Sequence, residues 1–141
     1  MPVEFIRQPD GLGQPLGRYS HVSVATGTEI VTVAGQVGIT RSGELVGDGG
    51  LTEQTWQVFR NVRTALESQG LGLTDIFKFT TYLVGADNIP EFMAARTAAF
   101  AEFFPDGAYP PNTLIVVARL VEDRFAVEVE AMAIRNAVRG R

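Results

Sequence analysis

The stretch "TEQTWQVFRNVRTALESQGLGLTDIFKFTTYLVG", residues 52–85, contains one element of each kind from which the chain is built. In its first half, apolar side chains recur every three or four residues, which predicts an amphipathic helix with one buried stripe. Thr52 is a suitable N-cap for this helix, and Gly70 is suited to end it. From Thr74 to Gly85, successive side chains alternate between two faces, which predicts a strand. The helical stripe consists of Trp56, Phe59, Val62, Ala65 and Leu66.

Further elements are expected on both sides of this stretch. A short first strand near residues 3–6 precedes a loop rich in Gly and Pro. The runs "SHVSVAT" and "EIVTVAGQVGI" are rich in β-branched residues, and the turn "GTE" between them predicts a hairpin. Downstream, a second helix is expected from about Ile89 to Phe103. Two closing strands, Thr113–Leu120 and Phe125–Ile134, are joined by "VEDR" and predict a second hairpin.

This order of elements predicts one two-layer α+β domain over residues 1–141, with a mixed six-stranded sheet and two helices on one face. The strands "EIVTVAG" and "NTLIVVARL" are apolar on both faces. Strands of this kind are typical of sheets that are buried on both sides. Because the helices cover only one face, we expect an oligomer that covers the other.

Composition narrows the class of protein. The chain has 141 residues and a net charge of −4, from 12 basic and 16 acidic residues, which argues against a nucleic-acid partner. It has no cysteine, which excludes disulfides, thiol nucleophiles and cysteine-ligated zinc. His21 is its single histidine, so no metal site is expected. No segment approaches the roughly 20 apolar residues of a membrane helix, and no signal pattern opens the chain, so we expect a cytoplasmic protein.

Two carboxylates in "AVEVEAMAI" are candidates for chemistry. Glu128 and Glu130 are two residues apart on an expected strand, so both point to the same face. One interpretation is cross-strand ion pairing with Arg119 or Arg124. The other is that one glutamate lines a cleft at a subunit interface, where partial burial raises its pKa and lets it orient water or take a proton.

Nearly the whole chain resembles the RidA family, also called YjgF or L-PSP. The resemblance rests on residues 52–85, on "LGRYS" (16–20) and "VAGQVGI" (33–39), and on "YPPNTLIVVARL" and "VEVEAMAI" near the end. It implies a chorismate-mutase-like α+β fold and a homotrimer with three clefts between subunits. It also implies hydrolysis of enamines and imines derived from amino acids, with release of ammonia and without a metal or organic cofactor.

The resemblance also implies roles for individual residues. Glu128 takes the place of the glutamate that positions water, and Tyr19 and Gly35 take the places of residues that shape the pocket. The family's carboxylate-binding arginine falls on Asn112, which can donate hydrogen bonds but brings no charge. Arg119 lies an odd number of residues beyond Asn112 and is expected on the opposite face. Arg96 is either a replacement for the missing arginine or a solvated helix residue.

Three functions remain open. The first is a hydrolytic enamine or imine deaminase acting on a non-standard small-molecule substrate, with Glu128 as the catalytic residue and Tyr19, Gly35, Asn112 and Arg96 as substrate-binding residues. The second is a trimer that binds a small metabolite without catalysis. The third is the ribonuclease or translation-inhibitor activity attached to some relatives, which the acidic charge and the single histidine disfavour.

Overall fold

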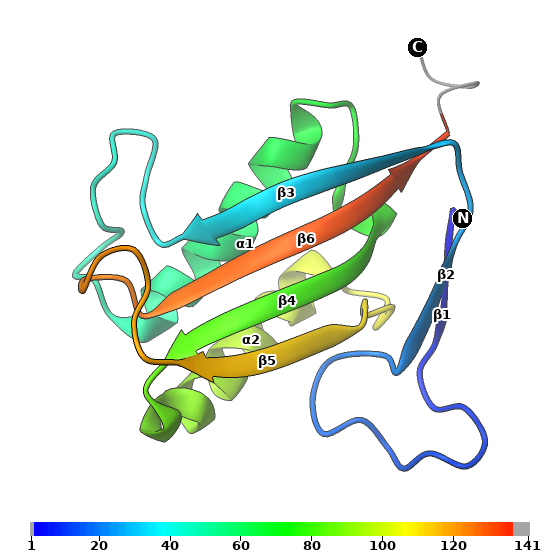
Figure 1. Cartoon of the computed structure of the whole chain (residues 1–141), viewed down its shortest axis with the longest axis horizontal. Helices are drawn as coiled ribbons and strands as arrows, with labels where there is room; N and C mark the ends of the chain where they lie inside the picture. Colours follow the sequence, from blue (N-terminus) through cyan, green and yellow to red (C-terminus); the bar gives the residue numbers. More distant parts are fainter. Residues whose placement is uncertain (1, 137–141) are drawn as a thin grey trace.

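The computed structural model describes residues 2–136 and forms an α+β fold. Figure 1 shows a four-stranded sheet with both long helices on one face and a separate two-stranded ribbon beside it. Two short 3-10 helices, Leu73–Asp75 and Ala86–Asn88, precede β4 and α2. The strands and helices are β1 (Val3–Ile6), β2 (Val22–Ala25), β3 (Glu29–Val37), α1 (Leu51–Glu67), β4 (Ile76–Val84), α2 (Ile89–Phe103), β5 (Asn112–Val117) and β6 (Val127–Arg135).

The six expected strands and their mixed directions are confirmed, but they do not form one sheet. The larger sheet has the order β3-β6-β4-β5, in which β6 is antiparallel to both neighbours and β4 and β5 are parallel. Strands β1 and β2 pair only with each other. The pairing of β4 with β6 shifts register between Ile76 and Lys78. At this irregularity, the Ser23 hydroxyl donates a hydrogen bond to the carbonyl of Phe77 at 2.6 Å. A side-chain hydrogen bond therefore links the two-stranded ribbon to β4 of the larger sheet.

Both predicted hairpins are wrong. At the "GTE" turn, the backbone N–H of Thr28 donates to the carbonyl of Arg135, at the end of β6, at 2.9 Å. This bond directs β3 to β6, while β2 pairs back to β1. Strands β5 and β6 also do not pair, because β4 lies between them. Local turn signals predicted pairing between neighbours in sequence, whereas the sheet is built from distant strands.

The two helices agree well with the sequence pattern. Helix α2 has the expected limits, and α1 begins at Leu51 with Gly50 as its N-cap instead of Thr52. The Thr52 hydroxyl instead donates to the Glu91 carboxylate at 2.9 Å, joining the first turns of the two helices. Both helices pack on the sheet through buried aromatic rings. These include Phe59, Phe79, Phe92, Phe100 and Phe104.

Gln54 fixes the loops at one end of the sheet. Its side chain is 1% exposed. Its Nε2 donates to the carbonyls of Gly49 and Arg124 at 2.9 and 3.1 Å, and its Oε1 accepts from the N–H of Ala126 at 2.9 Å. One buried amide thus satisfies three backbone groups that no strand or helix would satisfy.

The sheet face away from the helices is bare within residues 2–136 (Figure 1). Along β6, residues alternate between burial under the helices and partial exposure on this face, where Glu128 and Glu130 lie. Large apolar side chains also point to this side, including Ile30, which is 63% exposed, and Ile115, which is 42% exposed. The oligomer expected to cover this face stays a prediction. None of the helices within the described residues is both long and apolar enough to cross a bilayer.

Candidate functional site

Gly35 and Glu128 lie in direct contact on the bare face of the sheet. The pairing of β3 with β6 shifts register between Val33 and Gln36, which places the backbone of Gly35 under the Glu128 side chain. A Cβ atom added to Gly35 would lie 2.2 Å from Glu128 Oε2. Glycine is therefore needed at this position because the backbone approaches the carboxylate closely. Backbone conformation is not the reason, since the φ angle of Gly35 is not positive.

The Glu128 carboxylate is only partly solvated and forms no ion pair with any residue between 2 and 136. Burial, and then the charge of Glu130, raise the pKa of Glu128. Arg119 pairs with Asp123 at 3.4 Å, and Arg124 pairs with Glu122 at 2.7 Å. Among residues 2–136, neither Glu128 nor Glu130 forms an ion pair, so the ion-pairing interpretation is wrong.

Tyr82 is a further member of this group that the sequence analysis missed. It lies directly opposite Glu128 in the pairing of β4 with β6, and its hydroxyl donates a hydrogen bond to the Glu130 carboxylate. This bond, then burial and the charges of Glu130 and Glu128, raise the pKa of Tyr82. The alternation within residues 74–85 gives the face of Tyr82, but the register between strands so distant in sequence is not a local signal. We call Gly35, Tyr82, Glu128 and Glu130 the sheet-face cluster.

Asn112 is not part of this cluster within one chain. It is the first residue of β5 and pairs with Phe79, whose side chain is buried under the helices. Its Oδ1 accepts a hydrogen bond from the hydroxyl of Thr81, also fully buried, at 2.7 Å. Asn112 therefore belongs to the helix-covered face, opposite to Glu128. The hydrogen bond to Thr81 engages only Oδ1, so the Nδ2 group remains available to donate to a ligand.

Arg96 is buried, so its interpretation as a solvated helix residue is wrong. Its side chain is 3% exposed and lies over the Phe92 ring, with the guanidinium carbon 5.2 Å from the ring centroid. Nη2 contacts Met93 Sδ at 3.1 Å, whereas Nε and Nη1 have no hydrogen-bond partner among the described residues. Burial lowers the pKa of Arg96 to about 10, an effect that the neighbouring Tyr19 partly offsets.

Tyr19 lies in the segment 7–21 that connects β1 to β2. Its hydroxyl accepts from the backbone N–H of Leu16 at 3.1 Å, and its carbonyl accepts from Arg7 Nη1 at 3.1 Å. The same segment places Gly17 against Arg96, because a Cβ atom at Gly17 would lie 2.6 Å from Arg96 Nη2. Gly17, Tyr19 and Arg96 thus form a second group, which we call the loop–helix cluster.

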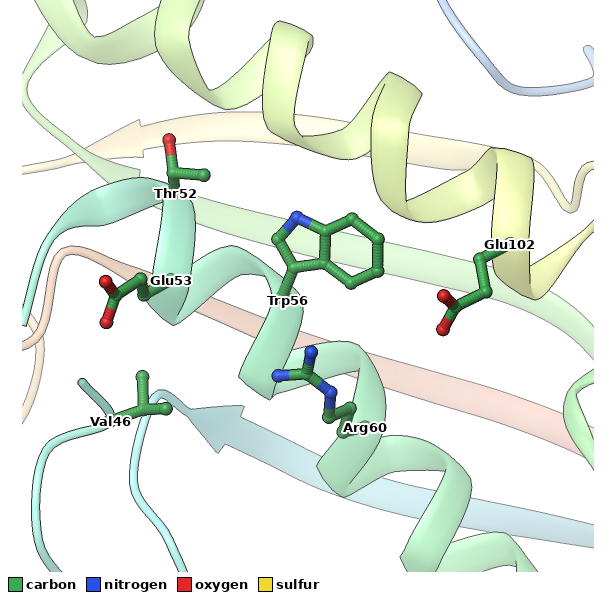
Figure 2. Close-up of a pocket in the computed structure, with 6 residues that line it drawn as sticks. All are labelled: Val46, Thr52, Glu53, Trp56, Arg60 and Glu102. Carbon is green, nitrogen blue, oxygen red and sulfur yellow. The ribbon is translucent and has the colours of Figure 1, made fainter.

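A third feature is an open groove of about 550 Å³ between the two helices and the loop before α1. In Figure 2, Trp56 points between α1 and α2, with Arg60 and Glu53 on one side and Glu102 on the other. Arg60 lies over the Trp56 ring at 5.5 Å, and the Glu53 carboxylate accepts the N–H of Asp48. The groove contains none of the candidate residues. It is lined by Val46, Thr52, Glu53, Trp56, Arg60 and Glu102.

Comparison of the sequence with known proteins identifies a family. The model of the endoribonuclease L-PSP family matches residues 12–135, which is most of the chain. The chain belongs to the L-PSP family. This confirms the resemblance on which the sequence analysis relied. A RutC family protein of Pyrococcus horikoshii is 32% identical over 124 residues, which cover 87% of this chain and 91% of that protein. The 2-iminobutanoate/2-iminopropanoate deaminase of Escherichia coli K12 is 31% identical over 114 residues, which cover 80% and 84%.

Solved structures of L-PSP relatives share the fold. The Rid family protein YyfB of Yersinia pestis superimposes with a TM-score of 0.83 at 28% identity, over 95% of this chain and 99% of that one. The YjgF gene product of Escherichia coli gives a TM-score of 0.67 at 26% identity, over 94% and 100%. The L-PSP fold therefore extends over nearly the full length of the chain.

Proposed function

We propose that this L-PSP protein is a hydrolytic deaminase of enamines or imines, with Glu128 as its catalytic residue. The single observation that supports this most is the Glu128 carboxylate, which lies on the Gly35 backbone with a raised pKa and no ion pair among the described residues. A carboxylate held in this way, with a raised pKa, is suited to general acid–base catalysis. The naming of an Escherichia coli relative, 31% identical, as an imine deaminase points to the same reaction class.

In the proposed reaction, an enamine first tautomerises to its imine. The imine, protonated on nitrogen, is attacked at carbon by water, and Glu128 takes one proton from the water to give a neutral carbinolamine. Glu128 returns this proton to the nitrogen, and the C–N bond then breaks to release ammonia. As the C=O bond forms, the hydroxyl proton passes to Glu128 and on to solvent, and a carbonyl compound remains. No electron is gained or lost, so the reaction requires no redox partner. Glu130 contributes by holding a negative charge near Glu128, which favours the protonated form of Glu128.

The site requires more than one copy of the chain. Glu128 lies on the bare sheet face, and Asn112 lies on the helix-covered face. We propose a homotrimer in which the bare faces meet and each cleft takes the sheet-face cluster from one subunit. Tyr19 and Asn112 then come from the neighbouring subunit, and Asn112 reaches the cleft from the edge of the sheet, where it is the first residue of the edge strand β5. The exposed Ile30 and Ile115 support such an interface, because large apolar side chains gain free energy when they leave water.

Asn112 affects the choice of substrate. With its Oδ1 engaged by Thr81, the amide offers an uncharged donor to the cleft. A donor of this kind suits a carbonyl or hydroxyl group better than a carboxylate, which arginine binds in a charge-assisted fork. We therefore propose a substrate whose group at this point is polar and neutral. The same observation favours the second candidate function, a trimer that binds a metabolite without catalysis.

One experiment separates the two functions. Imines are generated in solution, both the carboxylate-bearing 2-aminoacrylate and decarboxylated imines, and ammonia release is measured. Glu128→Gln should abolish the enzyme-dependent rate, while Glu44→Gln, at an exposed glutamate in the loop after β3, should leave it unchanged. Background rates for the wild type on every imine would leave only the binding function. In a companion test, Asn112→Arg should gain activity on carboxylate-bearing imines.

A further inference from the structure

Arg96 is the most unusual charged residue among those described. Buried polar groups in folded proteins nearly always have hydrogen-bond partners, and a buried cation is costly without one. Arg96 is 3% exposed, yet within residues 2–136 Nε and Nη1 have no hydrogen-bond partner and Nη2 donates only to the weak acceptor Met93 Sδ. The Phe92 ring contributes a cation–π contact but no hydrogen-bond acceptor. The fold thus presents a guanidinium with its hydrogen-bonding capacity almost unused.

The segment 7–21 lies over this guanidinium as a strap. At Gly17, the absence of a side chain lets the backbone approach Arg96 Nη2 and the Met93 methyl group. The strap is held mainly by bonds within itself. Arg7 donates to the carbonyls of Gly17 and Tyr19, and the Leu16 N–H donates to the Tyr19 hydroxyl. Leu16, next to Gly17, is 89% exposed. Few bonds therefore resist a displacement of the strap from α2.

We propose that Arg96 is the binding residue of a small-carboxylate site that the strap closes. When the strap lifts at Gly17, a carboxylate enters between the strap and α2 and accepts hydrogen bonds from the guanidinium. The fork of Nη2 with Nε, or with Nη1, matches the two carboxylate oxygens and replaces the weak contact to Met93. Phe92 and Met93 line the approach with apolar surface, which favours a short alkyl chain behind the carboxylate.

This site contains no member of the sheet-face cluster, although Tyr19 belongs both to the strap and to the proposed cleft. Arg96 compensates the negative charge of the ligand, and binding needs no proton transfer. Binding is therefore expected whether or not the protein is a deaminase. The class of ligand is a short monocarboxylate, such as a 2-oxo acid or a fatty acid of a few carbons. Inorganic oxyanions carry the same charge chemistry but lack the alkyl chain that Phe92 and Met93 would contact.

The test uses the full chain and observes Arg96 directly. The ¹H–¹⁵N resonance of Arg96 Nε is assigned with Arg96→Lys and followed while sodium propionate is added at constant ionic strength. Sodium sulfate is the second probe. Propionate should shift the resonance in a saturable manner, and sulfate should bind at least about tenfold more weakly. Absence of a propionate shift, or equal binding of the two anions, would overturn the proposal.

Two pairs of variants make the result specific. Arg96→Met should weaken propionate binding, followed by calorimetry, at least about tenfold, because a charge-assisted hydrogen bond is lost. Arg60→Met should have no effect, although Arg60 also lies over an aromatic ring. Gly17→Ala should weaken binding because the new methyl group occupies the space beside Nη2, while Gly13→Ala, in open space on the same strap, should not. Unchanged affinity in both Arg96→Met and Gly17→Ala would also refute the site.

Discussion

Replacing Gly35 by alanine tests the geometry at Glu128 most directly. The new Cβ atom would lie 2.2 Å from Glu128 Oε2, whereas ordinary contact begins at about 3.4 Å. The carboxylate must therefore retreat by about 1.2 Å, since the Cβ position is fixed by the backbone of β3. A displacement of about 1 Å at a catalytic group can cost roughly 100-fold in rate. We expect a loss of that size in kcat/KM for ammonia release.

The matched control is Gly72→Ala. Gly72, like Gly35, has no positive φ, and a Cβ atom there meets nothing within 4 Å. Its activity should stay within about twofold of the wild type. A second readout is independent of catalysis: the carboxyl carbon resonance of Glu128, followed through a pH titration, should move in Gly35→Ala and not in Gly72→Ala. If Gly35→Ala keeps wild-type kcat/KM and the same Glu128 titration, the contact does not determine the position of the carboxylate.

Further predictions concern charge and buried hydrogen bonds. The pKa of Glu128 is raised and its deprotonated form is the base, so kcat/KM should decrease as the pH is lowered, and this decrease should begin at a higher pH than for an ordinary glutamate. A profile that is flat down to about pH 4.5 would contradict this. Glu130→Gln removes the neighbouring charge and should move that fall to lower pH; an unmoved profile would leave burial as the only cause. Gln54→Leu should lower the free energy of unfolding in urea by about 2–4 kcal/mol, because it orphans three backbone groups; a loss below about 1 kcal/mol would mean that water replaces the amide. Arg96→Met should raise the free energy of unfolding by about 1–3 kcal/mol in carboxylate-free buffer, with Arg60→Met as the neutral control; a decrease would show that the buried charge is compensated.

Local patterns in the sequence predicted the helices and the shared face of the two glutamates. The limits of α2 follow from a turn signal and a regular apolar stripe, and Glu128 and Glu130 share a face because strand side chains alternate. The burial of Arg96 also had a local signal. Arg96 lies four residues after Phe92 and four before Phe100, both fully buried, so the helical period places it on the same stripe.

Contacts between distant strands were beyond the reach of such patterns. The hairpin signals were sound as local chemistry, but the pairing of β3 with β6 and of β4 with β5 outweighed them. The position of Tyr82 beside Glu130 depends on the register between β4 and β6. The face of Asn112 depends in the same way on the register of β5 against β4. Register is set by the packing of the whole sheet against the helices, and no single segment encodes it.

The uncompensated charges distinguish the two clusters from the rest of the fold. Arg135, by contrast, pairs with Glu29, with Nε and Oε1 2.7 Å apart. Glu128 and Arg96 have no ion-pair partner among residues 2–136, and burial raises the pKa of Glu128 and lowers the pKa of Arg96. Because they lie on opposite faces of the four-stranded sheet, they cannot neutralise each other within a chain. Burying two charges without partners destabilises the isolated fold. We infer that ligand binding at each cluster offsets this cost.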